Sequence, residues 1–506
     1  MDLELLLSMA VSLDEERPAV TGTDGRTLTT GELQAAAVNA AAILRRSGAA
    51  HAGFCDTNGL TFPVAFFGAV KAKMPFAPLN YRLADAQLGQ VVRGQDLVAV
   101  APPAQATRLG QLGVDRLLDS ASFLESALNI PADAAGVGEH APVDPDEVAL
   151  LLYTSGTTAA PKAAVLRHRH LAAYVIGTVE FGSASQDEAA LLSVPPYHIA
   201  GVMNLLSNLY MGRRIIYLDA FEPRRWLEVV LSESVTHAMV VPTMLARIVS
   251  VLGGTPADVP SLRTISYGGA KMPAAVIRQA LELFPDVAFA NAYGLTETSS
   301  TVCVLGPEDH RLAQASDDPA VRARLGSVGL PVPGIEVEIR DAEGLPCIRG
   351  RSGEIFVRGE QVAGEYVGAG SAGDGWFATR DGGHLDEAGY LFVEGRSDDT
   401  IIRGGENIAP AEIEDVLLAH DDVADCAVVG IDDEEWGQRI AAAVVLVEGS
   451  GSSPDDLRDY ARTQLRGSKT PDVVVVFDEL PYTDTGKLLR RVVREELTGS
   501  SVAPGR

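Results

Sequence analysis

Short apolar runs alternate with helical patterns through much of the chain. Apolar residues within 32–44 fall on one helical face, and Gly48 follows as a stop signal. Residues 61–73 repeat the helical pattern, and a strand-like run at 75–79 comes directly after it. Strands that alternate with helices favour layers, because each element must bury its apolar face against another. We therefore predict an α/β fold.

The same alternation returns over residues 189–293. Strand-like runs at 191–194, 214–218, 238–241 and 264–267 are separated by helical patterns such as 273–284. From residue 326 to 393 the pattern changes, and runs at 336–340, 353–358 and 390–394 stand between glycine-rich turns. Short strands with such turns predict an antiparallel or β-barrel-like part within a large, multi-subdomain N-terminal domain.

A domain boundary is expected near residues 396–399. The 506 residues exceed what one core usually holds, and the polar stretch "GRSDD" separates two patterned regions. Beyond it, Pro410 can start a helix, and residues 424–430 and 440–447 are strand-like. We predict a large domain over 1–396 and a small α+β C-terminal domain over 400–506.

Charge and cysteine usage narrow the class of protein. Lys and Arg total 41 against 68 Asp and Glu, a net charge of −27, which repels nucleic acid. No apolar run is long enough to span a bilayer, and the apolar stretch 3–13 lacks a signal peptide's positive region. We expect a soluble cytoplasmic protein without an integral membrane segment. No zinc-type spacing links the four cysteines, which read as free thiols: Cys55, Cys303, Cys347 and Cys426.

The strongest local signal is "LLLYTSGTTAAPKAAV" at residues 150–165, where an apolar strand enters a polar loop. Hydroxyls, backbone amides and an ammonium suit a polyphosphate, although composition alone fits a solvated loop equally well. The loop is not a Walker A motif, because Pro161 precedes the lysine. The candidate phosphate ligands are Thr154, Ser155, Gly156, Thr157, Thr158 and Lys162.

This segment resembles the Y-T-S-G-T-T-G-x-P-K-G signature of the acyl-adenylate-forming superfamily, with Ala159 and Ala163 in place of two glycines. Further blocks resemble the family's motifs in the family's order: "PPYHIAG", "SYGGAKMP", "NAYGLTET", "ATRDGGHLDEAGYLFVEGR", "RGGENIAPAEIE" and "PYTDTGKLLRR". The family activates carboxylic acids with ATP as acyl-AMP. The resemblance therefore implies an AMP-forming acid–thiol ligase with ATP, Mg²⁺ and coenzyme A as reactants.

The resemblance also implies roles for single residues. Tyr293 would pack on adenine, Asp381 would bind the ribose hydroxyls, and Arg396 would reach ribose or phosphate. Thr296 would bond the α-phosphate, and Glu297 would hold Mg²⁺, which prefers oxygen ligands. Lys487 would neutralise charge near the attacking carboxylate, and His198 would border it, although a buried structural histidine is the alternative. The remaining nucleotide candidates are Gly268, Gly269, Ala270, Asn291, Ala292 and Gly294.

The last blocks concern the thiol acceptor. Asp398 matches the family's hinge, here 397–399, and Gly404 and Gly405 would line the pantetheine tunnel. Trp436 would border that tunnel or, as an equal alternative, be an ordinary core residue. Lys469 matches a coenzyme A contact, but Ser468 stands where relatives often carry an aromatic residue. Arg380 likewise replaces the glycine that usually precedes the matching aspartate. The acceptor could instead be a carrier-protein thiol.

A nucleotide-binding protein with a decayed site is an alternative from another class. None of the motifs identifies the acid. We expect a homodimer only because dimers are the commonest oligomers of soluble proteins. Lys271 is expected to face solvent rather than the acyl group. Candidate acyl contacts are His198, Gly201, Val202, Lys271 and Thr301.

Overall fold

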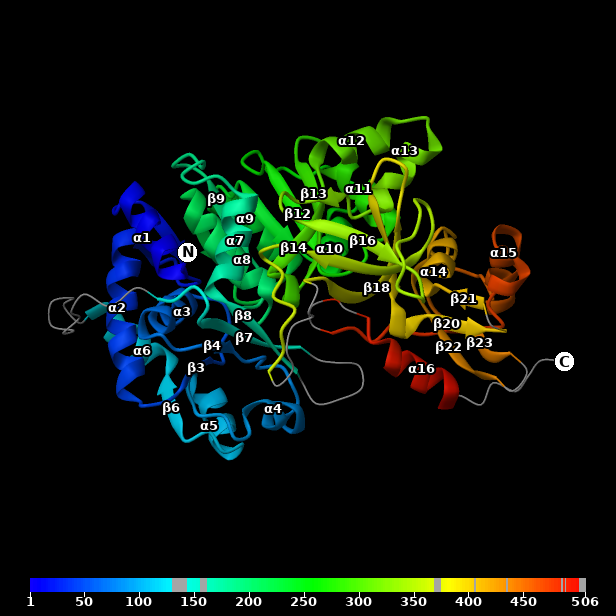
Figure 1. Ribbon diagram of the computed structural model, residues 1–506. Coiled ribbons are helices and arrows are strands. Elements are labelled where there is room, and N and C mark those ends of the chain that lie inside the picture. The colour runs from blue at the N-terminus through cyan, green and yellow to red at the C-terminus, as the bar shows by residue number, and fades with distance from the viewer. Residues whose placement is uncertain are drawn as a thin grey trace.

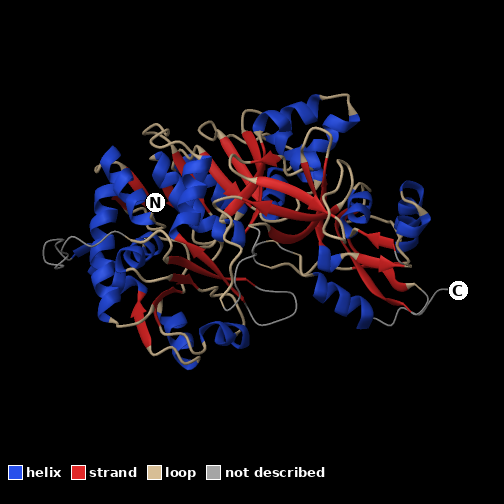
Figure 2. Cartoon of the chain, in the orientation of Figure 1, coloured by secondary structure: helices blue, strands red, loops and turns tan. Residues whose placement is uncertain are grey.

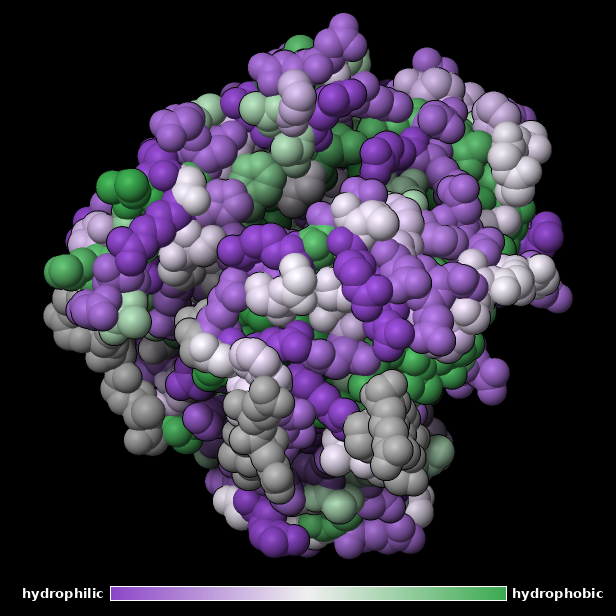
Figure 3. Space-filling view, turned by 90° about the vertical axis from the view of Figure 1, so that its right-hand side faces the viewer, coloured by the Kyte–Doolittle hydropathy of each residue, from purple (hydrophilic) through white to green (hydrophobic). Residues whose placement is uncertain are grey.

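The computed structural model describes residues 1–129, 143–154, 162–367, 375–404, 406–433, 436–483, 486 and 488–499. N-terminal elements lie at one end of an elongated molecule and C-terminal elements at the other (Figure 1), and sheets flanked by helices recur along it (Figure 2). None of the described helices is long and apolar enough to cross a membrane. Hydrophilic residues cover most of the face in Figure 3, with apolar residues in small groups among them.

A six-stranded sheet forms the first layer, in the order β6-β5-β3-β4-β7-β8. Its strands pair in parallel except for β7 and β8, which flank the predicted phosphate loop and are antiparallel. The strands are β3 (His51–Phe54), β4 (Phe76–Pro78), β5 (Leu97–Ala101), β6 (Arg116–Asp119), β7 (Val148–Thr154) and β8 (Lys162–Arg167). The predicted alternation of strands and helices is confirmed.

Helices cover this sheet and build the first core. Thr29 caps α2 with Glu32 in a reciprocal capping box. Gly68 brings α3 so close to α2 that a Cβ there would lie 2.6 Å from the Cβ of Ala40. Phe62 and Phe66 of α3 fill the space against the sheet. The helices are α1 (Leu3–Leu13), α2 (Thr30–Arg46), α3 (Thr61–Ala72), α4 (Asp85–Val92), α5 (Pro103–Gln111) and α6 (Ser120–Asn129).

A nine-stranded sheet follows, in the order β15-β14-β13-β12-β11-β9-β10-β1-β2. Strands β1, β10, β9, β11, β12 and β13 are parallel, so their carboxyl ends meet at one edge, where open α/β sheets bind ligands. The strands are β1 (Pro18–Thr21), β2 (Thr27–Thr29), β9 (Ala189–Leu192), β10 (Arg214–Tyr217), β11 (His237–Val240), β12 (Thr264–Gly268), β13 (Ala288–Leu295), β14 (Ser300–Leu305) and β15 (Leu330–Pro331). The helices are α7 (His168–Thr178), α8 (Ile199–Met211), α9 (Pro223–Ser232), α10 (Pro242–Leu252), α11 (Ala274–Leu283), α12 (Pro307–Ala315) and α13 (Pro319–Ala323).

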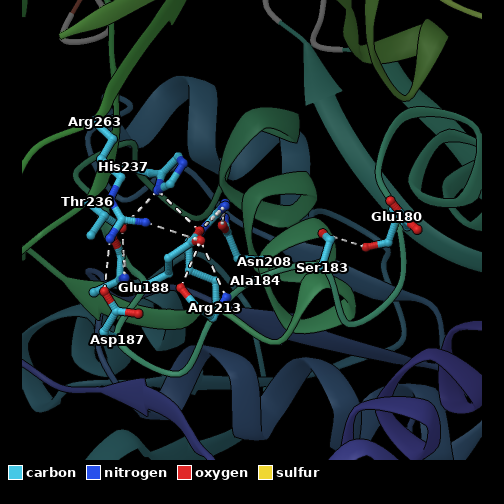
Figure 4. A network of polar contacts seen from close by, with 12 residues as sticks. Glu180, Ser183, Ala184, Asp187, Glu188, Asn208, Arg213, Thr236, His237 and Arg263 are labelled. Atoms are coloured by element: carbon cyan, nitrogen blue, oxygen red, sulfur yellow. Dashed lines mark hydrogen bonds and ion pairs between the residues drawn. The ribbon is translucent and has the colours of Figure 1, made fainter. Parts of the chain in front are cut away.

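A network of ion pairs joins neighbouring strands at the edge of that sheet where the parallel strands begin, opposite their carboxyl ends (Figure 4). Glu188, Arg213 and Arg263 each stand directly before a strand, and His237 begins one. The Glu188 carboxylate accepts from Arg213 at 2.7 Å and lies 3.7 Å from the His237 ring. Burial, followed by Arg213, lowers the pKa of His237 to about 4. This network holds the strand starts in register, on the edge away from the candidate site.

The glycine-rich region forms a four-stranded antiparallel sheet, in the order β16-β17-β18-β19. The expected antiparallel strands are confirmed, but the barrel-like arrangement is wrong. Within the described part of the chain, β16 and β19 are the sheet's outer strands and no closed barrel forms. The strands are β16 (Glu336–Arg340), β17 (Gly353–Arg358), β18 (Phe377–Leu385) and β19 (Leu391–Arg396), followed by the 3₁₀ turn η4 (Ser397–Asp399).

The C-terminal part has its own three-stranded sheet, in the order β22-β23-β24. Alternate residues of β22 face different cores: Val428 packs with α14 and α15, and Val429 packs with α16. A sheet covered on both faces is a small α+β unit, as predicted. Its elements are β20 (Ile401–Arg403), β21 (Glu406–Ile408), α14 (Pro410–Leu418), β22 (Val423–Asp433), β23 (Gly437–Leu446), α15 (Pro454–Gln464), β24 (Val473–Val476) and α16 (Arg490–Gly499).

Candidate active site

A buried carboxylate lies at the carboxyl end of β13. Glu297 is in the 3₁₀ turn η2 (Thr296–Thr298) and only 7% exposed. The hydroxyl of Tyr366 donates to its Oε1 at 2.5 Å. The Glu297 carbonyl accepts from the backbone N–H groups of Ala363 and Gly364 at 2.9 and 3.2 Å. The segment 363–367, which we call the strap, therefore holds this glutamate by side chain and backbone.

The strap also contacts the strand that follows the predicted phosphate loop. The N–H of Val165 donates to the carbonyl of Glu365 at 2.9 Å, and the N–H of Val367 donates to Ala163 at 3.0 Å. Lys162, the first residue of β8, places its Nζ 5.9 Å from the centroid of the Tyr366 ring. One tyrosine thus lies between the candidate phosphate lysine and the candidate metal carboxylate.

A second cluster forms around Asp381 of β18. Its Oδ2 accepts from the Tyr293 hydroxyl at 2.6 Å, and its Oδ1 accepts from Arg396 at 3.0 Å. Asp381 and Arg396 are direct partners in the β18–β19 pairing, whereas Tyr293 comes from β13 in the large sheet. Burial, followed by Asp381, raises the pKa of Tyr293. Two motifs far apart in sequence therefore meet here.

Arg380 keeps the backbone conformation that its position requires. Its φ is 61°, in the left-handed region that glycine adopts freely. Left-handed backbone costs a non-glycine residue roughly 1–2 kcal/mol. The replacement of the family's usual glycine therefore stores strain beside Asp381 without redirecting the strand.

Glycines bring β12, β13 and β14 into close contact. A Cβ on Gly268 would lie 2.2 Å from the carbonyl oxygen of Ala292, and one on Gly294 would lie 1.6 Å from that of Ser300. Gly269 has a φ of +87° and precedes Ala270 at the end of β12. The Asn291 amide donates to the carbonyl of Ser327 at 3.1 Å. These residues shape the edge on which Thr296 lies.

His198 precedes α8 and has an unusual environment. Its Nε2 is shielded from solvent, with no hydrogen-bond partner among the described residues. Burial, followed by Arg82, lowers its pKa to about 4, so the ring is neutral at pH 7. An unpaired buried nitrogen is costly unless a ligand satisfies it. Nearby, Gly201 gives α8 room against Pro195, whose carbonyl oxygen would lie 2.8 Å from a Cβ.

The other proposed acyl contacts fall into two groups, residues packed within the large domain and a lysine that contacts the C-terminal unit. Thr301 accepts a hydrogen bond from the hydroxyl of Tyr174 at 3.3 Å, and Val202 is fully buried in α8. Lys271 instead places its Nζ 2.7 Å from Oδ2 of Asp415, on α14 of the C-terminal unit. Lys271 is exposed, as expected, and engages that carboxylate.

Several predicted residues lie outside the described part of the chain: Ser155, Gly156, Thr157, Thr158, Gly405 and Lys487. The backbone of Thr154 ends β7. Gly486, directly before Lys487, has a φ of +73°, and a Cβ there would lie 2.3 Å from Oγ1 of Thr243. Thr243 is at the start of α10, just beyond the carboxyl end of β11. The C-terminal motif therefore reaches the edge of the large sheet that carries Glu297.

The proposed coenzyme A contacts are partly brought together. Gly404, with a φ of +56°, donates its N–H to the carbonyl of Trp436 at 2.8 Å, and the indole covers its Cα face. Lys469, in the turn η5 (Gly467–Lys469), pairs with Glu412 at 2.5 Å instead. Asp398 is exposed in η4, and its neighbour Asp399 lies 3.6 Å from Arg490 of α16.

The donor set fits a magnesium–nucleotide complex better than a protein-only metal cage. Within the described ranges no three His, Cys, Asp or Glu side chains group to hold a metal. Mg²⁺ usually takes one or two carboxylates and completes its shell with water and phosphate oxygens. Glu297 offers one such carboxylate, and Oε2 has no hydrogen-bond donor among the residues described.

Sequence reasoning missed Tyr366, Tyr174 and Thr379. Tyr366 stands in "GEY", which matches none of the motifs considered. Thr379 accepts from the N–H of Asp381 at 3.1 Å and donates to the carbonyl of Ile355 at 2.8 Å. The tertiary pairing of β17, β18 and the strap reveals the contacts of Thr379 and Tyr366, and the packing of α7 against β14 reveals that of Tyr174.

Known proteins are similar to this chain in sequence and in fold. The AMP-binding enzyme family matches residues 8–367, and its C-terminal domain matches residues 412–487. The chain belongs to the AMP-binding enzyme family. A feruloyl-CoA synthase of the family, from Amycolatopsis sp, is 35% identical over 93% of this chain and 94% of its own. The predicted superfamily membership is confirmed.

Two other family members widen the comparison. The fatty acid–[acyl-carrier-protein] ligase ScoC from Streptomyces coeruleorubidus is 32% identical over 94% of this chain and 93% of its own. The ATP-bound crystal structure of MatB from Rhodopseudomonas palustris is 25% identical, with a TM-score of 0.86 over 98% of this chain and 99% of that one. The similarity therefore extends over both the N-terminal and C-terminal parts.

Proposed function

We propose that the protein uses MgATP to convert a carboxylic acid into acyl-AMP and transfers the acyl group to coenzyme A. The observation that carries this proposal is the convergence of the Glu297 and Asp381 clusters on elements that join β13, with Lys162 beside the first. Membership in the family, with a feruloyl-CoA synthase as relative, supports the same activity.

The first step needs positioning and charge neutralisation more than a protein nucleophile. A carboxylate oxygen attacks the α-phosphorus of ATP, the bond to the bridging oxygen breaks, and pyrophosphate leaves. Lys487 neutralises charge on the attacking side, and Thr296 bonds the α-phosphate. Glu297 would hold Mg²⁺, which would supply positive charge to the phosphates. His198 offers its Nε2, which has no hydrogen-bond partner in the described part of the chain, beside the acid.

The nucleotide is held from two sides. Asp381 and Arg396 bind the ribose. Tyr293 packs beside the adenine, and the strand ends surround the adenine. The segment 154–158 and Lys162 cover the β- and γ-phosphates. The strand-end residues assigned to the nucleotide are Gly268, Gly269, Ala270, Asn291, Ala292 and Gly294.

In the second step the thiol sulfur attacks the acyl carbon and AMP leaves. We place the large domain at 1–396, a hinge at 397–399 around Asp398, and the small domain at 400–506. Rotation about the hinge withdraws Lys487 and brings Gly404, Gly405, Trp436 and Lys469 to the thiol. The separate core of the C-terminal unit supports this division.

A carrier-protein thiol is the second candidate acceptor. The similarity to ScoC favours it, and Ser468 offers no ring for stacking on the adenine of coenzyme A. Aromatic acids are the first to test, because a feruloyl-CoA synthase is among the relatives. Cytoplasmic location and homodimer assembly stay predictions.

The test separates the two half-reactions. Purified protein is incubated with MgATP and pooled aromatic, branched and linear acids, and mass spectrometry follows acyl-AMP without coenzyme A and acyl-CoA with it. Lys487→Ala should slow acyl-AMP formation by about 10²–10³-fold, the usual cost of losing one group aimed at transition-state charge. It should affect consumption of supplied acyl-AMP much less. Equal loss in both half-reactions would contradict the role of Lys487, and no acyl-AMP from any acid would sink the proposed function.

A further inference from the structure

The strap contacts both halves of the candidate phosphate and metal site. It pairs with β8 through Glu365 and Val367, and it holds the carbonyl of Glu297 through Ala363 and Gly364. The guanidinium of Arg167, at the end of β8, donates to both carboxylate oxygens of Glu365, at 2.8 and 3.1 Å. Tyr366 is thereby fixed where its hydroxyl reaches Glu297.

We propose that Tyr366 is the positioning residue of the metal site, orienting Glu297 so that its second carboxylate oxygen faces Mg²⁺. This inference rests on the proposed function of Glu297. The hydroxyl donates to Oε1 and leaves Oε2 without a donor among the described residues. When a donor holds one oxygen of a carboxylate, the second oxygen is fixed in direction. Residues that hydrogen-bond to a metal ligand in this way commonly tune its affinity for the metal.

The surroundings of Glu297 make such a donor necessary. The side chain is 7% exposed, so water supplies few of the hydrogen bonds that a carboxylate needs. Tyr366 supplies one and adds no charge, so it does not compete electrostatically with the cation. The position of Lys162 beside the same ring ties the orientation of the carboxylate to the strand that leaves the phosphate loop.

The experiment measures metal binding without turnover. The protein is mixed in excess with a non-hydrolysable ATP analogue, no acid is added, and electron paramagnetic resonance reports free Mn²⁺ as a probe for Mg²⁺. Tyr366→Phe, which keeps the ring and removes the hydroxyl, should weaken Mn²⁺ binding about 10–100-fold. Affinity for the metal-free analogue should stay unchanged. Glu297→Gln should weaken Mn²⁺ binding at least as much, and the double variant no further.

Tyr390→Phe is the matched control. Its hydroxyl also donates to a carboxylate oxygen, Oδ1 of Asp309 at 2.6 Å, but away from Glu297, so Mn²⁺ affinity should match the wild type. Wild-type affinity in Tyr366→Phe, with the fold verified by circular dichroism, overturns the proposal, as does a further loss in the double variant. A Mn²⁺ shift in a protein that makes no acyl-AMP from any acid supports this inference and refutes only the proposed activity.

Discussion

Both carboxylate oxygens of Asp381 accept hydrogen bonds from side chains in the described part of the chain. Tyr293 and Arg396 each donate to one oxygen, and a carboxylate oxygen can accept more than one hydrogen bond, as a ribose hydroxyl would require. The protein partners fix the plane of the carboxylate, so the remaining lone pairs point in set directions. Recognition of the sugar then depends on orientation as much as on charge.

Asp381→Asn should raise the KM for ATP about 10–100-fold, the range expected for losing a hydrogen bond to a charged group. The rise in KM should be smaller with 2′-deoxyATP, because this nucleotide lacks one of the hydroxyls from which Asp381 would accept a hydrogen bond. Steady-state kinetics with both nucleotides measures this difference. Equal losses with ATP and 2′-deoxyATP would show that Asp381 does not contact the 2′-hydroxyl.

The motifs predicted individual residues better than their partners. Tyr293 belongs to one motif and Asp381 and Arg396 belong to another, and the two motifs meet in the fold. Tyr366 could not be predicted, because it lies 69 positions from Glu297 and belongs to no recognised pattern. Lys271 was expected to be exposed, but its contact with Asp415 depends on how the two parts of the chain pack.

Elements were predicted well wherever periodicity was strong. The helical pattern at 273–284 became α11 (Ala274–Leu283), and the run at 336–340 became β16 with the same bounds. The barrel-like arrangement failed because alternating residues and turns specify antiparallel strands, whereas closure depends on which outer strands pair. The position of β1 and β2 at the edge of the nine-stranded sheet likewise could not be predicted from the local sequence pattern.

Gly294→Ala tests the close approach of β13 and β14. The added Cβ would lie 1.6 Å from the carbonyl oxygen of Ser300, and the bulge in this pairing leaves little room to shift. We expect destabilisation of about 3 kcal/mol, the upper end for overpacking, seen as a lower Tm by calorimetry. Gly451→Ala, where a Cβ meets nothing within 4 Å, is the control. Equal Tm values for the two variants would contradict this account.

At the scale of the whole molecule, contacts between described residues join the C-terminal unit to the large sheet. Lys271 pairs with Asp415, and Gly486 packs on Thr243. The charged pair is about half exposed, so it is worth roughly 0–1 kcal/mol and salt screens it. It biases the docked arrangement without locking it.

Asp415→Asn should therefore slow acyl-AMP formation by about two- to five-fold at low salt, and the difference should vanish near 1 M salt. The thiol-dependent step should not slow, because the docked arrangement opposes it. Rapid-quench measurement of both half-reactions checks this outcome. Asp455→Asn, which removes an exposed pair within α15, should leave both rates unchanged. A salt-independent defect would argue against an ion-pair effect.

Stability should fall as pH drops, because several buried histidines are held neutral, His168 and His170 among them. Nδ1 of His168 accepts from the N–H of Leu3, and Nδ1 of His170 accepts from the N–H of Arg167. Burial lowers each pKa to about 4, so below pH 6.5 the unfolded chain binds protons that the folded chain does not. Their stabilisation is present above pH 6.5 and lost towards pH 4, at about 2 kcal/mol each by pH 5. The Tm of His170→Asn between pH 7.5 and 5 should decline less steeply than that of the wild type, and parallel curves would refute this.

The strand order of the large sheet has a consequence for protein synthesis. Val20 of β1 pairs with Ile215 of β10, so β1 leaves the ribosome long before its partner exists. At about 5–20 residues per second the wait is roughly 10–40 s. During that interval the β1–β2 hairpin has an unpaired edge, and unpaired edges are sites where nascent chains aggregate. The yield of folded enzyme therefore depends on what shields the first strands until translation passes β10.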